Sequence, residues 1–389
     1  MIKNNRVAIL GSTGSVGCQA VEVAKNLGIK VDLLSASSSV DLIEKQAREL
    51  KPRICVLTNK TAASKLKARL VDTSIKVYGG NGSLNSAILD SDADVAVNAV
   101  SGYAGLFPAI ACAQSGKRIA MSNKEAIVIA YKFLKEEIDK NNAELIPVDS
   151  EHSAIFQSLQ GNTQNSIKRI ILTSSGGPFK GKNRKELVGI TAKQALAHPT
   201  WKMGAKITVD SASLMNKGFE VIEAVRLFNV LPNQVDVVVH PQSIMHSAVE
   251  YNDNSIIAQL GAPDMRTCIQ YAITYPHRTP SLSESLDFAK ISQLTFDKPD
   301  VETFSLLSLA YYAINEDGII PAVLNASDEV AVDAFLNDKI GFVQLFDVVT
   351  QVVREFKNIE NPSLEDIVNA DMEARIVTKE LINKIITNS

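Results

Sequence analysis

The stretch Arg6–Gly17 reads RVAILGSTGSVG and decides the fold of the first part of the chain. An apolar run, Val7–Leu10, leads directly into Gly11, Gly14 and Gly17, and a helical pattern follows. Glycines permit a tight turn, after which the backbone N–H groups of the helix start can hold a pyrophosphate. The spacing is GxxGxxG rather than GxGxxG, so a purely structural turn is the alternative. The order strand, loop and helix favours dinucleotide binding.

Short β-branched runs alternate with helical patterns from residue 6 to about residue 148. Gly28, Pro52 and Gly116 stand where helices commonly end. Such alternation predicts βαβ units and a parallel sheet wound on both faces, which is a Rossmann-like domain over residues 1–148. The strand-like runs are Val7–Leu10, Lys30–Leu34, Arg53–Leu57, Val95–Ala99, Arg118–Met121 and Glu144–Val148.

The residues after the second strand indicate which dinucleotide binds. Sites specific for NAD place an acid there to bind the ribose hydroxyls. This chain has Ser35-Ala36-Ser37-Ser38-Ser39 instead, and Asp32 lies earlier, within the strand. Serine hydroxyls tolerate a 2′-phosphate that a carboxylate would repel, so the sequence favours NADP(H) and predicts an NADPH-binding domain.

The pattern changes after residue 148. Residues 149–275 predict an α+β catalytic domain. Its polar segments near 174–183 and 195–205 are longer than simple connections between elements usually are, which indicates a functional role. The second segment is a candidate lid. Residues 276–299 predict a linker and residues 300–389 a C-terminal helical bundle. The strand-like runs are Ile167–Leu172, Ile207–Val209, Val235–Val239, Ser243–Tyr251 and Ser255–Leu260. The helical patterns cover about 302–316, 322–337, 342–357 and 364–386.

Local signals accompany these elements. Asn252–Asn254 reads as a hairpin turn, Pro321 suits a first helical turn, and Ser363 with Asp366 reads as a capping box.

Composition bounds the classes of function. The 389 residues are 46% hydrophobic and 21% charged, which is typical of a globular protein. The net charge of −3 gives no sign of the excess positive charge with which proteins bind nucleic acid or an anionic membrane. The four cysteines lie far apart, as expected for reduced thiols. The absence of an apolar stretch of ~20 residues, and a start that runs straight into a strand, lead us to expect a cytoplasmic protein without a membrane span or leader.

An acid pair follows the last strand of the first domain. Residues 147–152 read PVDSEH, and Asp149 and Glu151 would point to the same side of an extended chain. Two ionised carboxylates so close favour a cation, and oxygen ligands suit Mg²⁺ or Mn²⁺. The alternative is two solvated acids at a helix N-terminus. His152 is not assigned to the metal.

A second set of polar residues lies in Asp210–Glu220, which reads as a short strand followed by an amphipathic helix. Asn216 and Glu220 are four apart and share a helix face, so Glu220 could be a third oxygen ligand, while Asn216 and Lys217 face an anion near the helix start. The alternative is an ordinary surface lysine and glutamate.

Two loops complete the candidate site. Thr173–Pro178 reads TSSGGP and offers hydroxyls and glycines to phosphate oxygens. His198–Gly204 carries Trp201, the single tryptophan of the chain, in a polar loop, which suggests a lid rather than a core position.

Together these segments strongly resemble the 1-deoxy-D-xylulose 5-phosphate reductoisomerase family. The matching strings, in family order along nearly the whole chain, are GSTGSVG (11–17), SNKEA (122–126), PVDSEHSAIFQ (147–157), SSGGPF (174–179), HPTWKMG (198–204), DSASLMNKGFEVIEA (210–224), HPQSIMHS (240–247) and LNASDEVAVDAF (324–335). The resemblance implies a metal- and NADPH-dependent rearrangement and reduction of 1-deoxy-D-xylulose 5-phosphate to 2-C-methyl-D-erythritol 4-phosphate, in the non-mevalonate route to isoprenoids. It also implies a homodimer.

The resemblance also implies roles for individual residues. The metal ligands are Asp149, Glu151 and Glu220, and the catalytic residues are these three with Lys124. The substrate-binding residues are Lys124, Ser150, Glu151, Ser175, His198, Trp201, Ser211, Asn216, Lys217 and Glu220. The cofactor-binding residues are Thr13, Gly14, Ser15, Val16, Ser37, Ser38, Ser39, Asn123, Glu125, Met203 and Gly204. One departure is Ser37-Ser38-Ser39, where many members are expected to carry Gly-Lys-Asn; it weakens the expected preference for NADP over NAD.

Two other classes of function stay open at this point. One is a metal-independent NADP-dependent dehydrogenase of another small phosphorylated substrate. The other is a non-catalytic NADP-sensing protein, which would need neither the three acids nor a lid.

Overall fold

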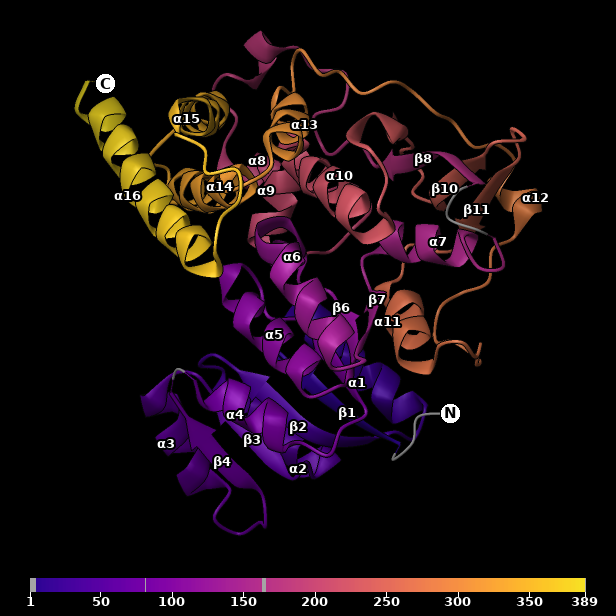
Figure 1. Cartoon of the computed structure of the whole chain (residues 1–389), viewed down its shortest axis with the longest axis vertical. Helices are drawn as coiled ribbons and strands as arrows, with labels where there is room; N and C mark the ends of the chain where they lie inside the picture. Colours follow the sequence, from indigo (N-terminus) through magenta and orange to yellow (C-terminus); the bar gives the residue numbers. More distant parts are fainter. Residues whose placement is uncertain (1–4, 81, 163–165, 389) are drawn as a thin grey trace. The chain divides into compact units, whose positions relative to one another are not determined.

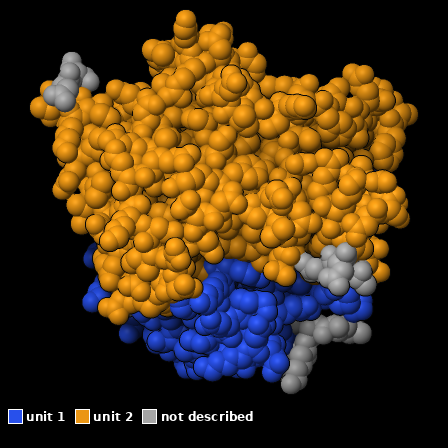
Figure 2. Space-filling model, turned by 45° about the horizontal axis from the view of Figure 1, so that its top comes forward, with its two compact units in different colours: residues 1–126, 131–153, 264–285 blue, residues 127–130, 154–263, 286–389 orange. Residues whose placement is uncertain are grey.

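The computed structural model describes residues 5–80, 82–162 and 166–388, and they form two compact units. Unit 1 comprises residues 1–126, 131–153 and 264–285, and unit 2 comprises residues 127–130, 154–263 and 286–389 (Figure 2). This division differs from the four segments expected from the sequence, because residues 264–275 group with unit 1 and the C-terminal helices group with unit 2. The division into functional domains therefore stays a prediction.

Unit 1 is built on a seven-stranded sheet in the order β4-β3-β2-β1-β5-β6-β7, with every neighbouring pair parallel. The strands are β1 (Arg6–Leu10), β2 (Lys30–Ala36), β3 (Ile54–Leu57), β4 (Lys76–Gly79), β5 (Val95–Asn98), β6 (Arg118–Met121) and β7 (Glu144–Pro147). Val7, Ala8, Ile9 and Leu10 are fully buried, as expected for a strand covered on both faces. The Rossmann-like fold expected from the sequence is confirmed.

Helices connect the strands of unit 1 in βαβ order (Figure 1). They are α1 (Ser15–Asn26), α2 (Val40–Leu50), α3 (Lys60–Arg69), α4 (Ser83–Asp90), the 3₁₀ turn η1 (Tyr103–Gly105), α5 (Leu106–Gln114) and α6 (Lys124–Lys140). Helix α11 (Met265–Thr274), from later in the chain, also belongs to unit 1 and packs against α1. The strand order reverses between β1 and β5, and ligands of such sheets bind at the carboxyl ends of the strands on either side of that reversal.

Strand β4 was not predicted from the sequence. Its four residues, Lys76–Gly79, form the exposed edge of the sheet and none of them is buried. Without a buried face there is no apolar run to read, and a lysine at a sheet edge is a common guard against edge-to-edge pairing.

Unit 2 contains a four-stranded sheet in the order β11-β10-β8-β9. The strands are β8 (Ile167–Ser174), β9 (Val235–Val239), β10 (Met245–Tyr251) and β11 (Ile256–Leu260). Strand β8 runs parallel to β9 and antiparallel to β10, and β10 and β11 form the predicted hairpin, with Asn254 in the left-handed region at its turn. The helices before the C-terminal bundle are α7 (Ser150–Ser158, which begins in unit 1), η3 (Arg184–Leu187), α8 (Ala192–Ala195), α9 (Ala205–Ser213), α10 (Met215–Phe228), η4 (Pro232–Gln234) and α12 (Phe288–Ile291).

Two local predictions are wrong. Ile207–Val209 is not a strand but part of helix α9, because Thr208, Val209 and Ala212 bury one helical face that three successive β-branched residues concealed. Asp149 and Glu151 do not lie on an extended chain either: Ser150 begins helix α7, so Asp149 precedes this helix and Glu151 is in its first turn.

Four helices form the predicted C-terminal bundle, in which α14 packs against α15 and α16 (Figure 1). They are α13 (Leu306–Glu316), α14 (Ile320–Leu336), α15 (Phe342–Glu355) and α16 (Leu364–Asn388). Pro321 lies in the first turn of α14, and Ser363 and Asp366 exchange the hydrogen bonds of a capping box, as expected. In the described part of the chain, every helix is too short or too polar to cross a membrane.

Candidate active site

The glycine loop lies at the carboxyl end of β1 and has little room for side chains. Gly11 has a φ of +77°, and a Cβ there would lie 2.6 Å from the backbone oxygen of Ala99, just after β5. A Cβ on Gly17 would lie 2.1 Å from the oxygen of Gly11. Gly14 caps α1 without a side-chain hydrogen bond. The first N–H groups of α1 are therefore presented by backbone alone, the arrangement that binds a pyrophosphate.

Neighbouring side chains hold this loop in place. The N–H of Gly11 donates to Ser35 Oγ at 3.1 Å, and the N–H of Ser12 donates to the Ser35 oxygen at 2.8 Å. Gln46, buried on α2, donates from Nε2 to the Ser12 oxygen at 2.8 Å and accepts from Ser12 Oγ at 2.8 Å. Sequence reasoning missed Gln46, because a lone glutamine in a helix carries no signal.

Asp32, the acid that precedes Ser35–Ser39, lies inside β2, and its carboxylate is already paired with other side chains. Its carboxylate is buried, pairs with Arg6 at 3.0 Å and with Arg53 at 3.4 Å, and accepts from Ser91 Oγ at 2.7 Å. Burial would raise the pKa of Asp32, but Ser91 and Arg53 outweigh it and lower the pKa. Beyond β2 the exposed residues are Ser37, Ser38 and Ser39, so the described chain presents hydroxyls at that point.

Asn123 and Glu125, predicted to line the cofactor, are buried at the start of α6. Asn123 caps the helix by accepting from the N–H of Ala126 at 3.0 Å. Its Nδ2 donates to the oxygens of Val100 and Gly102 at 2.8 and 2.9 Å and to Glu125 at 2.7 Å. The pair therefore fixes the loop after β5, and contact with a cofactor stays a prediction.

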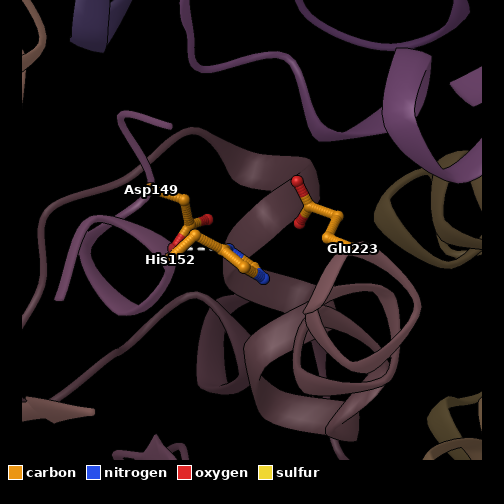
Figure 3. A group of neighbouring side chains, drawn as sticks. All are labelled: Asp149, His152 and Glu223. Atoms are coloured by element: carbon orange, nitrogen blue, oxygen red, sulfur yellow. Dashed lines mark ion pairs between the residues drawn. The ribbon is translucent and has the colours of Figure 1, made fainter. Parts of the chain in front are cut away.

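The acid pair lies where β7 passes into α7. Asp149 Oδ2 is 3.1 Å from Nζ of the buried Lys124, and Asp149 Oδ1 is 3.8 Å from Nδ1 of the buried His152. Figure 3 shows this second pair, which its dashed line marks. Burial would raise the pKa of Asp149, but Lys124 and His152 outweigh it and hold the pKa well below its usual range. Asp149 is thus an ionised carboxylate.

Glu151 differs from a freely solvated acid. It is half-buried in the first turn of α7, where the helix dipole stabilises negative charge, and it accepts a hydrogen bond from Ser150 Oγ. The helix N-terminus named as the alternative is therefore the actual setting of the pair, but both acids are partly removed from water.

In unit 2, α9 and α10 meet at Leu214, whose φ of 61° breaks the helix. Asn216 and Lys217 occupy the first turn of α10. Asn216 Nδ2 donates to Glu220 Oε1 at 2.6 Å, and Lys217 forms an ion pair with Glu220. Lys217 and Glu220 are 3% and 1% exposed, so the alternative of an ordinary surface pair is wrong. The shared helix face predicted for Asn216 and Glu220 is confirmed.

The candidate phosphate loop, Thr173–Pro178, begins with the last two residues of β8, and its glycines pack on the end of α9. Gly176 and Gly177 have φ values of +83° and +66°, and a Cβ on Gly177 would lie 2.7 Å from the backbone oxygen of Ser211. Ser175 Oγ accepts from the N–H of Gly177 at 3.3 Å. Because of this backbone contact, Ser175 and Ser211 belong to one local structure.

His198 joins the same group from the lid. Its Nε2 is 3.0 Å from Ser175 Oγ, and its Nδ1 accepts from the N–H groups of Thr200 and Trp201 at 3.1 and 2.9 Å. Burial lowers the pKa of His198, which favours the neutral ring. Since Nδ1 accepts, the proton of the neutral ring is on Nε2, which donates toward Ser175.

The rest of the lid is more open. Trp201 is half-exposed, with its ring centroid 6.2 Å from that of His246. Met203 is half-exposed and Gly204, which caps α9, is exposed. A polar loop with an accessible tryptophan agrees with the predicted lid position rather than with a core position.

Three family models match the chain. Their descriptions are 1-deoxy-D-xylulose 5-phosphate reductoisomerase over residues 7–131, 1-deoxy-D-xylulose 5-phosphate reductoisomerase C-terminal domain over residues 145–228, and DXP reductoisomerase C-terminal domain over residues 260–377. Among curated proteins, the chain is 49% identical over 376 residues to 1-deoxy-D-xylulose 5-phosphate reductoisomerase of Ruminiclostridium cellulolyticum, covering 97% of this chain and 99% of the relative.

Solved structures agree with these matches. One is 1-deoxy-D-xylulose 5-phosphate reductoisomerase from Zymomonas mobilis in complex with NADPH, with a TM-score of 0.91, 38% identity, and coverage of 97% of this chain and 98% of that one. Another is DOX-P reductoisomerase in complex with NADPH, fosmidomycin and magnesium, with a TM-score of 0.91, 34% identity, and coverage of 98% of both chains.

Proposed function

The chain belongs to the 1-deoxy-D-xylulose 5-phosphate reductoisomerase family, and we propose which of its residues carry the reaction. The enzyme converts 1-deoxy-D-xylulose 5-phosphate to 2-C-methyl-D-erythritol 4-phosphate with NADPH and a divalent metal ion, in isoprenoid precursor biosynthesis. The observation that carries this function is identity of 49% along nearly the whole of both chains. A metal-independent dehydrogenase is not favoured, because a similar solved enzyme contains magnesium.

The proposed metal ligands are Asp149 and Glu151 of unit 1 and Glu220 of unit 2, each of which offers a carboxylate oxygen. The donor set fits Mg²⁺ or Mn²⁺, which prefer oxygen. Two observations support the fit: Lys124 and His152 keep Asp149 ionised, and Glu220 is a buried carboxylate held by Asn216 and Lys217. A bound divalent ion supplies a Lewis acid that stabilises negative charge on substrate oxygens.

The proposed phosphate site is formed by Ser175, Ser211, Asn216 and Lys217, with His198 beside it. Support comes from the contact of the phosphate loop with Ser211, from the first turn of α10, and from the Nε2–H of His198. Helix N-termini, hydroxyls and a buried ammonium suit a phosphate. Binding the phosphate anchors one end of the substrate, and that binding energy orients the reacting carbons.

The proposed cofactor site begins at the glycine loop, where Thr13, Gly14, Ser15 and Val16 receive the pyrophosphate. Ser37, Ser38 and Ser39 face the adenosine 2′-phosphate, supported by their exposure and by the absence of an acid among them. Asn123, Glu125 and Gly204 also line the cofactor, and Met203 packs near the nicotinamide. NADPH supplies the hydride that reduces the rearranged aldehyde.

Lys124 and Ser150 are proposed to contact the substrate close to the metal ligands. Lys124 already neutralises Asp149 from a buried position, so its ammonium can donate to an oxygen of the substrate without a new desolvation cost. Trp201 is proposed to close over the substrate and exclude water from the aldehyde.

We also propose that the enzyme is a cytoplasmic homodimer. Free cysteines support a reducing compartment, since the described structure contains four of them and pairs none. Edge strand β11 supports self-association, because Ile256 and Ile257 are exposed on it. Light scattering of the purified protein tests the dimer, and a monomer at micromolar concentration would contradict it.

The decisive test of the function follows NADPH absorbance with 1-deoxy-D-xylulose 5-phosphate present. We expect oxidation of NADPH that needs the substrate, stops with EDTA and returns with excess Mg²⁺ or Mn²⁺. Full turnover in EDTA would support the metal-independent dehydrogenase instead.

A further inference from the structure

A charge triad of one half-buried lysine and two buried aspartates links α9 to the C-terminal bundle within unit 2. Its members are Lys206 and Asp210 on α9 and Asp328 in the middle of α14. Lys206 Nζ is 2.7 Å from Asp210 Oδ2 and 2.8 Å from Asp328 Oδ2. The two carboxylates are almost completely buried, and the Lys206 ammonium also lies 4.6 Å from the centre of the Phe219 ring on α10.

The triad is unfavourable for α9 considered alone. A lysine in the first turn opposes the helix dipole, because that end carries positive partial charge. A lysine that precedes an aspartate by four residues is also the less stabilising order of such a pair. The carboxylate of Asp328 offsets both terms by bringing negative charge to the start of α9.

Asp328 in turn depends on Lys206. A carboxylate buried in the middle of a helix is costly unless a cation lies beside it. Burial holds the pKa of Asp328 above its ordinary value, and Lys206 opposes that rise without cancelling it, so the negative charge of Asp328 depends on the lysine. Each of the two side chains therefore fixes the other, and the position of α9 along α14 follows from their contact.

Helix α9 is the common support of the phosphate-binding groups. It carries Ser211, its preceding residues end the lid, and it leads through Leu214 into the turn that holds Asn216. The phosphate loop also rests on it, through the close approach of Gly177 to the Ser211 oxygen. A shift of α9 would displace all of these groups together.

We propose that Asp328, acting through Lys206, is a positioning residue for binding of the substrate phosphate. The C-terminal bundle then contributes to substrate affinity although none of the proposed substrate-binding residues lies in it. This inference rests on the phosphate role proposed for Ser175 and Ser211.

The test measures steady-state kinetics of the full-length enzyme with saturating Mg²⁺. Asp328→Asn keeps the size of the side chain and removes its charge. We expect KM for 1-deoxy-D-xylulose 5-phosphate to rise about tenfold, less than the roughly hundredfold that a ~1 Å misplacement can cost. KM for NADPH and kcat should stay within about threefold, and inhibition by inorganic phosphate should weaken by the same factor as substrate binding.

The matched control is Asp371→Asn. Asp371 is also a buried acid of the bundle, but it pairs with Arg375 inside α16, at 2.7 Å. It should lower the melting temperature without changing KM for the substrate. If Asp328→Asn does not fold, Lys206→Met tests the same link from α9, and Lys206→Arg should restore the wild-type KM.

The outcomes separate this inference from the proposed phosphate site. Unchanged KM and phosphate inhibition in Asp328→Asn, or equal changes in both aspartate variants, would overturn the positioning role. Ser211→Ala is measured alongside. If it raises KM while Asp328→Asn does not, only the positioning role fails, whereas no effect of Ser211→Ala refutes the phosphate site itself.

Discussion

Gln46 offers the sharpest test of how the Rossmann-like unit prepares its cofactor loop. Its side chain makes two hydrogen bonds of 2.8 Å to Ser12, which is fully buried. Gln46→Met keeps the shape of the side chain and removes both. Each buried group left unpaired costs ~1–3 kcal/mol, so the two destabilise the loop conformation by ~2–6 kcal/mol. Relaxation of the loop recovers part of this free energy. Every ~1.4 kcal/mol of destabilisation that remains weakens NADPH binding tenfold.

We therefore expect KM and Kd for NADPH to rise at least about tenfold in Gln46→Met, with KM for 1-deoxy-D-xylulose 5-phosphate nearly unchanged. NADPH binding is measured by fluorescence titration and KM by the decrease in absorbance. Lys45→Met is the matched control, because Lys45 is the exposed neighbour on α2. An NADPH affinity equal to that of the control, in a folded protein, would refute the claim that the loop must be held before the cofactor arrives.

Four further predictions concern unit 2. Glu220→Gln should lower kcat by ~100-fold or more, the scale of losing one electrostatic stabiliser; near-normal turnover at saturating metal would remove Glu220 from the metal site. Lys217→Ala should raise KM for the substrate and lower kcat/KM, and unchanged steady-state constants would contradict its phosphate role. Gly177→Ala should weaken inhibition by inorganic phosphate, because its Cβ would lie 2.7 Å from the Ser211 oxygen; wild-type inhibition would show that the loop can yield. Burial lowers the pKa of His198, so its contribution to stability is complete above its unfolded pKa of about 6.5 and is lost as pH falls below that value; thermal melts should show a smaller loss of stability between pH 7 and pH 5 in His198→Gln than in the wild type, and parallel curves would count against this.

The sequence predicted the parallel sheet well, because six of its strands bury at least half of their residues and contain apolar runs. It failed at β4, whose residues are exposed or half-buried and give no such run. It failed again at Ile207–Val209, where β-branched residues suggested a strand, whereas packing against α10 and α14 favours a helix. In both cases the deciding contacts come from residues far away in the chain.

The candidate site shows the same limit. Spacing was enough to place Asn216 and Glu220 on one helix face, since a helix brings residues four apart together. The same use of spacing predicted an extended backbone for Asp149 and Glu151, and that was wrong. Two acids separated by one residue can also stand at the start of a helix, which is where these two lie. Gln46 and Asp328 act through tertiary hydrogen bonds and ion pairs, so no local pattern could single them out.

Asp32 bears on how coenzyme choice could be re-engineered. Arg6, Arg53 and Ser91 occupy its carboxylate inside β2, so this acid is not available to a ribose. A redesign toward NADH therefore has to add a new carboxylate among the exposed serines 37–39 and leave the one in the strand untouched. Neutralising Asp32 would instead remove the carboxylate that pairs with Arg6, while Arg53 would keep its ion pairs with Asp90 and Asp92, and it would weaken the sheet without altering which nicotinamide coenzyme the enzyme accepts.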